Sequence, residues 1–201
     1  MSLSIDYYFA PQSPWAYLGH QRFARIAREA GAKINVLPVD LGGKVFPVSG
    51  GLPLNKRAPQ RQAYRLLDMK RFADHLGMPI NVQPTYFPVA GDDAAQLIIA
   101  ADLKDGTEAA MALAFEVFKA VWVNEQNIED PQVLAAALQR AGLSAQRLDD
   151  SHTQAVIERY EEDTRLAIEA GVFGAPSYVI DGEIFWGQDR LDFVARRLAQ
   201  G

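Results

Sequence analysis

Ser13 is the residue of this sequence best placed to do chemistry. It follows an apolar, strand-like segment and precedes Pro14 in the stretch YFAPQSPWAYLG. A serine in front of a proline is a common way to begin a helix, with the serine as N-terminal cap and the proline at the first helical position. The free amides and the dipole of a helix N-terminus also favour an anion. Ser13 is therefore either a plain cap or a hydroxyl at an anion-binding helix end.

The composition excludes several other kinds of site. Cysteine is absent, which removes disulfides, thiolate nucleophiles, cysteine-ligated zinc and dithiol redox chemistry. His20, His75 and His152 lie far apart, so they predict no metal site. No phosphate-binding loop is present, and no G-x-S-x-G elbow surrounds Ser13. If sulfur takes part in the chemistry, a ligand must bring it.

Length and charge predict the class of protein. A chain of 201 residues with 49% hydrophobic character can bury the core of one or two domains. The net charge of -5, without a basic cluster, argues against a nucleic-acid partner. The N-terminus lacks a basic and apolar leader, and no stretch is apolar for long enough to span a membrane. We expect a soluble cytoplasmic protein without a membrane partner.

The strand signals that would position Ser13 lie at the two ends of the chain. Residues 3–9 and 33–39 are strand-like and flank a predicted helix at 14–30, which Gly31 ends. The C-terminal part follows the order helix, strand, strand, helix. These elements are predicted at residues 155–170, 177–181, 183–186 and 189–198. Together the two ends predict an α/β fold, a thioredoxin-like four-stranded mixed sheet with flanking helices.

The middle of the chain, roughly 57–150, has almost no strand signal and predicts a large all-helical insertion. Its helices are expected at 58–77, 92–106, 107–127 and 130–143. This pattern predicts a discontinuous thioredoxin-like domain at 1–50 and 151–201, with a helical insertion domain at 51–150.

Pro176 is the second unusual feature, because it stands directly before a predicted strand. Only about 5–6% of X-Pro bonds are cis, but thioredoxin-like folds commonly place a cis-proline here, beside the N-terminus of the first helix. The main chain of Ala175 would then be free to pair with an extended peptide. In the same fold, dithiol members carry their nucleophilic cysteine at the place of Ser13, where a hydroxyl would stabilise a thiolate that the ligand supplies.

At this point the chain resembles a known family, the kappa-class glutathione transferases and 2-hydroxychromene-2-carboxylate isomerases of the DsbA-like thioredoxin superfamily. The resemblance covers nearly the whole length in the right order, and it looks most like the bacterial isomerases. The motifs that carry it are SPWAYLG (13–19), NKRAPQRQAYRLLDMKR (55–71), Asp130-Pro131 with Leu134, and GVFGAPSYVIDGEIFWGQDRLDF (171–193).

The resemblance implies glutathione as cofactor, with Ser13 as the hydroxyl that hydrogen-bonds its thiolate. Ala175, before Pro176, would pair its main chain with the cysteinyl backbone of glutathione. Gln188 and Asp189 match the place that holds the γ-glutamyl end. Asp189 is alternatively a plain helix cap.

Asn55 and Lys56 resemble the polar pair with which the family contacts glutathione from the insertion. The spacing to Tyr64 is shorter here than in the transferases, and the usual double proline is reduced to one. Lys56, Arg57 and Arg61 would alternatively form a positive rim for a substrate carboxylate, or simply the polar face of a helix.

Aromatic side chains would wall the pocket for an aryl substrate, although several of them must be ordinary core. The candidates are Tyr8, Phe9, Trp15, Tyr17, Phe87, Trp122 and Trp186.

The function implied by the resemblance is a glutathione-dependent isomerase of the 2-hydroxychromene-2-carboxylate type. It would act on a small aromatic or unsaturated carboxylate by reversible thiolate addition, and the family implies a homodimer. A kappa-like glutathione transferase or peroxidase with the same site is one alternative. A non-catalytic thioredoxin-like module that binds peptides or other ligands is another.

Overall fold

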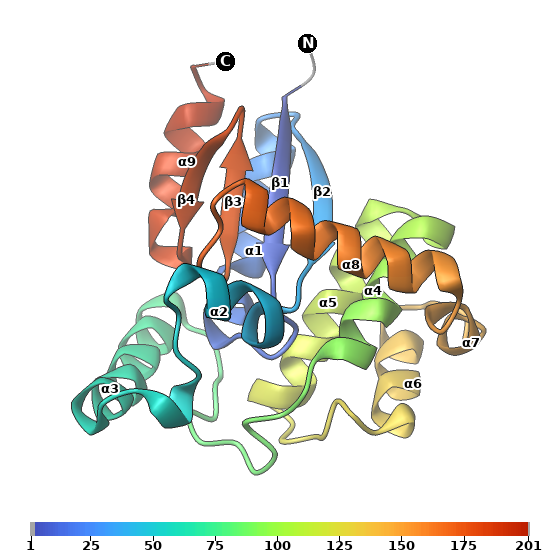
Figure 1. The fold of residues 1–201 in the computed structure, drawn as a ribbon, viewed down its shortest axis with the longest axis horizontal. Helices are drawn as coiled ribbons and strands as arrows, with labels where there is room; N and C mark the ends of the chain where they lie inside the picture. The colour runs from blue at the N-terminus through green and yellow to red at the C-terminus, as the bar shows by residue number, and fades with distance from the viewer. Residues whose placement is uncertain (1–2, 201) are drawn as a thin grey trace.

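The computed structural model describes residues 3–200, and its centre is a four-stranded sheet (Figure 1). The strands lie in the order β2-β1-β3-β4. They are β1 (Ser4–Phe9), β2 (Lys33–Pro38), β3 (Ser177–Ile180) and β4 (Glu183–Trp186). β1 runs parallel to β2 and antiparallel to β3, and β3 runs antiparallel to β4. The predicted mixed sheet, built from both ends of the chain, is confirmed.

Helices cover both faces of the sheet because successive strand residues point to opposite sides. Tyr7 and Phe9 of β1 join the main core with α1 (Pro14–Glu29), whereas Tyr8 packs in a smaller cluster with Ala167 of α8. α8 (Gln154–Glu169) crosses the front of the sheet in Figure 1, and α1 lies behind it. The final helix, α9 (Leu191–Leu198), packs beside α1.

The middle of the chain is helical, as predicted. Residues 51–150 contain no strand. After the short α2 (Phe46–Ser49), the helices are α3 (Pro59–Leu76), α4 (Asp92–Asp105), α5 (Thr107–Trp122), α6 (Pro131–Arg140) and α7 (Arg147–Ser151). No helix among residues 3–200 is long and apolar enough to cross a membrane.

Three predicted helix boundaries are wrong. α6 ends at Arg140 rather than at residue 143, since Gly142 has a positive φ of 71°. α5 ends at Trp122 rather than at residue 127, because the N–H groups of Val123 and Asn124 both turn back to the carbonyl of Lys119. Glu125 then has a positive φ of 52°, which no α-helix accommodates. The last helix was expected from Asp189, but the chain first makes a 3₁₀ turn at Gln188–Arg190.

The insertion divides into two parts in space. α3 stands apart at the lower left of Figure 1, whereas α4 to α7 gather on the other side of the molecule. α5 shares the main core with the sheet, and the ring of its Phe118 lies 5.7 Å from that of Phe9. α3 packs against α1, where Phe72 makes an edge contact with Trp15. The domain boundaries at 50 and 150 stay a prediction.

His20 ties α1 to both β1 and α5. Its Nε2 lies 2.9 Å from the carbonyl of Met111, so this nitrogen donates. Its Nδ1 is then the acceptor for the hydroxyl of Tyr7 at 3.1 Å. The ring is 2% exposed, and burial lowers its pKa from 6.5 to about 4. The folded protein therefore holds His20 neutral.

This burial predicts a pH dependence of stability. The unfolded chain takes up a proton on His20 below about pH 6.5 and the folded chain only near pH 4, so acidification over this window favours unfolding by about 3 kcal/mol. Urea unfolding at several pH values measures this effect. Between pH 6.5 and pH 4, the free energy of unfolding of His20→Gln should fall by about 3 kcal/mol less than that of the wild type. Equal pH slopes in the two proteins would contradict the assignment.

Gly19 permits α1 to pack closely against the 3₁₀ turn that begins at Gln188. A Cβ atom at this position would be 2.8 Å from Cβ of Gln188 and 3.0 Å from the hydroxyl of Tyr178. Both neighbours are buried, so neither has free space to move into. The contact fixes the distance between α1 and Gln188.

We expect Gly19→Ala to destabilise the fold by about 1–3 kcal/mol, the usual cost of overpacking. Gly42→Ala is the matched control, because a Cβ there meets no atom within 4 Å. Urea unfolding of both variants measures the difference. A Gly19→Ala protein as stable as its control would show that α1 and Gln188 separate easily.

Candidate active site

Ser13 is the N-terminal cap of α1. Its Oγ accepts a hydrogen bond from the N–H of Ala16 at 3.2 Å, and Pro14 takes the first helical position. Its own carbonyl accepts from the N–H of Tyr17. Because Oγ is the acceptor in the cap, its proton remains available for donation to another group. The cap and a donor role are therefore compatible.

The hydroxyl of Ser13 donates to the carbonyl of Ala175, the residue before Pro176. The two oxygens are 3.5 Å apart, at the long limit for a hydrogen bond, so this contact is weak. The peptide bond between Ala175 and Pro176 is cis. The N–H of Ala175 makes no hydrogen bond within residues 3–200. A main-chain donor thus lies unpaired beside Ser13.

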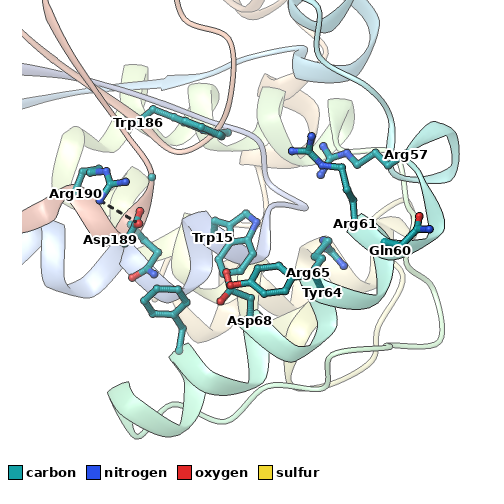
Figure 2. Close-up of a pocket in the computed structure, with 14 residues that line it drawn as sticks. Trp15, Arg57, Gln60, Arg61, Tyr64, Arg65, Asp68, Trp186, Asp189 and Arg190 are labelled. Atoms are coloured by element: carbon teal, nitrogen blue, oxygen red, sulfur yellow. Dashed lines mark ion pairs between the residues drawn. The ribbon is translucent and has the colours of Figure 1, made fainter.

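A pocket of about 590 Å³ opens next to Ala175 (Figure 2). One wall comes from Ala175 and the segment 186–190, and the opposite wall comes from α3 and Arg57 before it. Trp15 lies between the two walls in Figure 2. The lining residues are Trp15, Arg57, Gln60, Arg61, Tyr64, Arg65, Asp68, Phe72, Ala175, Trp186, Gly187, Gln188, Asp189 and Arg190.

The pocket brings together seven of the residues that the sequence singled out, namely Trp15, Arg57, Arg61, Ala175, Trp186, Gln188 and Asp189. Ser13 reaches this pocket through its contact with Ala175 rather than by lining it. Asn55 and Lys56 are exposed in the 3₁₀ turn Leu54–Lys56, just before Arg57, and they do not line it.

Five aromatic candidates lie in the core or against it, outside the pocket lining, namely Tyr8, Phe9, Tyr17, Phe87 and Trp122. Tyr17 is buried, and its hydroxyl donates to the carbonyl of Pro79 at 2.7 Å. Trp122 is fully buried, and its ring centre lies 4.8 Å from that of Phe87. Of the seven aromatic candidates, Trp15 and Trp186 line the pocket.

Trp186, the last residue of β4, covers one side of the pocket. Its indole lies across the backbone of Gly174, where a Cβ would come within 2.3 Å of Nε1, and it makes an edge contact with Phe173. The ring is still 51% exposed. A half-exposed indole at the mouth of a pocket offers an apolar face to a ligand.

Gln188 is a buried polar residue of this wall, and a hydrogen bond orients it. It is 1% exposed, and its Oε1 accepts from Arg22 of α1 at 3.1 Å. Its Nε2 has no partner among residues 3–200, which is uncommon for a buried amide. Beside it, Asp189 pairs with Arg190 at 3.5 Å. Arg22, which orients Gln188, carries no signal in the sequence.

The wall on α3 consists of two rows of side chains. Residues four apart share one face of a helix. Arg61 and Arg65 make one row, which Arg57 extends from the segment before the helix. Gln60, Tyr64, Asp68 and Phe72 make the other. The spacing of the three arginines is visible in the sequence, but only Arg57 and Arg61 were predicted to act together.

Arg65 is the buried member of its row, at 9% exposure. Its guanidinium lies over the ring of Phe87 at 5.1 Å and over that of Trp122 at 5.7 Å. Burial and the neighbouring charge of Arg57 lower its pKa to about 10. Phe87 and Trp122 thus support the pocket by holding Arg65.

The donors around Ala175 suit an extended ligand. The N–H of Ala175 and the Nε2 of Gln188 are unpaired, and both residues line one wall. The Ser13 hydroxyl lies at a helix N-terminus, where an anion is favoured. No cluster of three His, Asp or Glu residues within 3–200 is arranged to hold a metal ion. The site can therefore pair with an extended ligand and stabilise one negative charge.

Comparisons with known proteins agree with this fold. The family model of the DsbA-like thioredoxin domain matches residues 4–199. A 2-hydroxychromene-2-carboxylate isomerase of Pseudomonas putida is 31% identical over 190 residues, which cover 93% of this chain and 90% of the relative. Glutathione S-transferase kappa 1 of Homo sapiens is 26% identical over 98% of this chain and 91% of its own.

A solved 2-hydroxychromene-2-carboxylate isomerase superposes with a TM-score of 0.81 at 28% identity, covering 98% of this chain and 95% of that one. The chain therefore belongs to the DsbA-like thioredoxin family and, within it, to the group that contains the 2-hydroxychromene-2-carboxylate isomerases and the kappa-class glutathione transferases.

Proposed function

We propose that this protein is a glutathione-dependent isomerase of the 2-hydroxychromene-2-carboxylate type. The observation that carries the proposal is the Ser13 hydroxyl at the N-terminus of α1, 3.5 Å from the carbonyl of Ala175 and next to a pocket large enough for a small aryl compound. The relatives named as isomerases support the reaction class.

Bound glutathione would supply a thiolate that adds to an electrophilic carbon of the substrate double bond, permits rotation, and leaves again, so that no net conjugate forms. Ser13 would stabilise that thiolate by exchanging its weak bond to Ala175 for a charge-assisted one, while Oγ still accepts from Ala16.

The wall formed by Ala175 and residues 186–190 would hold the peptide part of glutathione. Ala175 would offer its unpaired N–H to the cysteinyl backbone. Gln188 would donate its unpaired Nε2 to the γ-glutamyl end, and Asp189 would accept from the ammonium group. Asn55 and Lys56, exposed beside Arg57, remain proposed contacts to glutathione from the side of the insertion.

The substrate would occupy the space between the two walls. Trp15 and Trp186 would contact its apolar part, and Arg61 would bind its carboxylate. Residues on α3 would thus choose and orient the substrate while Ser13 acts on the sulfur. We also propose a homodimer, as the family implies.

A kappa-like glutathione transferase is the second candidate, supported by the similarity to the human enzyme of that class. The two functions differ in whether glutathione is consumed. A non-catalytic thioredoxin-like binding module would use the same pocket without turnover.

Steady-state assays separate these functions. With an isomerisable benzylidenepyruvate substrate and catalytic amounts of glutathione, we expect many turnovers at constant thiol concentration. Loss of thiol in step with product would establish transfer instead. Failure of glutathione to bind at millimolar concentration would support the binding module.

The role of Ser13 is tested with Ser13→Ala. A hydrogen bond to a charged group is worth about 1.5–3 kcal/mol and one pKa unit corresponds to about 1.4 kcal/mol. The pKa of the bound glutathione thiol should therefore rise by about one to two units in the variant. Ultraviolet absorbance of the thiolate across a pH titration measures this shift.

Asp130→Ala provides the matched control for that experiment. Asp130 also caps a helix, with its carboxylate accepting from the N–H of Gln132 at 2.8 Å, but it lies outside the pocket. Both variants should lose about 1 kcal/mol of stability through the cap. Only Ser13→Ala should change the thiol pKa, and an unchanged value there would refute the proposed role.

A further inference from the structure

The arginine wall, defined as Arg57, Arg61 and Arg65, has no acidic partner. None of the three forms an ion pair within 4 Å with a carboxylate of residues 3–200. Several other arginines do have such partners, and Arg147 contacts both Asp105 and Asp150. The wall therefore brings three positive charges together at one pocket without an ion-pair partner.

The members of the wall also repel one another. Burial and the charge of Arg61 lower the pKa of Arg57, and burial and the charge of Arg57 lower that of Arg65. A largely buried guanidinium without a counter-ion is costly, and an anion that enters the pocket removes part of that cost. The arrangement is therefore suited to binding an anionic ligand.

The wall is held in place rather than loosely solvated. Nε of Arg57 donates to the carbonyl of Leu52 at 2.8 Å, and the rings of Phe87 and Trp122 hold Arg65. Figure 2 shows Arg57 and Arg61 with their guanidinium groups side by side, across the pocket from Arg190. Planar guanidinium groups in such a position suit bidentate binding of carboxylates.

The charge of this side of the pocket indicates how many anionic groups it takes. Asp68 is the acidic residue of α3 that lines the pocket with the three arginines. Three positive charges and one negative charge leave a net charge of plus two. On the opposite wall, Asp189 and Arg190 compensate each other. A ligand with two negative groups would neutralise the pocket.

We propose that the arginine wall selects an aryl or unsaturated substrate that carries two anionic groups. This inference rests on the proposed function, and it names the substrate class of the same pocket. Arg61 and Arg57 bind one carboxylate near the mouth, and Arg65 binds the second group deeper along α3. Trp15 and Phe72 contact each other edge-on, with ring centres 6.0 Å apart, and pack against the apolar frame that joins the two anionic groups.

Glutathione itself carries two carboxylates and is the competing occupant of the wall. The two cases differ in what an arginine variant changes. If the wall belongs to the substrate, its loss weakens the aryl dianion and leaves glutathione affinity unchanged. If the wall belongs to glutathione, both the affinity and the salt dependence of glutathione binding change.

The test is calorimetric titration of the whole protein with trans-cinnamate, trans-4-carboxycinnamate and glutathione, each alone. We expect wild type to bind the dicarboxylate about tenfold or more tightly than the monocarboxylate. Arg61→Gln should weaken the dicarboxylate about tenfold, equivalent to about 1.4 kcal/mol, and glutathione less than twofold. Arg61→Lys keeps the charge but loses the planar fork, so it should restore only part of the affinity.

Lys70→Gln is the matched control, because Lys70 is an exposed cation on α3 and lies outside the pocket lining. It should leave all three affinities unchanged. Arg65→Met is tested beside it, with thermal unfolding as a check on folding, and should also remove the preference for two charges. Because Arg61 is exposed, its variants report on binding even if Arg65→Met fails to fold.

Two results would overturn the inference. One is equal affinity of wild type for the two cinnamates, and the other is loss of glutathione binding in Arg61→Gln to the same extent as loss of the dicarboxylate. The proposed function fails separately: if wild type binds the dicarboxylate but not glutathione, the anion site stands and the isomerase assignment falls.

Discussion

The position of α1 determines the geometry of the site, because the Oγ atom of its cap, Ser13, meets Ala175, which lies 162 residues further along the chain. The atom accepts from the N–H of Ala16 and donates to the carbonyl of Ala175. α1 is in turn locked to the sheet through the buried ring of His20 and approaches Gln188 closely at Gly19. With α1 fixed, the helix N-terminus and the unpaired N–H of Ala175 meet at one edge of the pocket.

The two walls of the pocket have different chemical characters because they come from different parts of the chain. The wall from the C-terminal strands offers main-chain and amide donors, with Asp189 and Arg190 in mutual contact. The wall from α3 offers guanidinium groups without counter-ions. Polar donors suit a peptide, whereas concentrated positive charge suits a small anion. One pocket can thereby orient two unlike molecules toward each other.

The sequence predicted the sheet, the helical insertion and the cap at Ser13, since each of these follows from local patterns. Hydrophobic periodicity identifies which residues are buried but not what they pack against. Trp122 and Phe87 were expected to face a substrate, and they instead support Arg65. The contact of Gln188 with Arg22 and the packing of Arg65 on Phe87 and Trp122 arise from long-range packing, so no local pattern contains them.

α3 has a consequence for how such enzymes diversify. It packs against α1 but stands away from the α4 to α7 group, and its pocket face contributes few residues to the main core. Mutations on that face therefore alter charge and shape at the pocket while the sheet, the cap of α1 and the loop before β3 stay intact. Selection can change which compound enters the pocket and leave the proposed thiolate site at Ser13 unchanged, because the two sites belong to different segments of the chain.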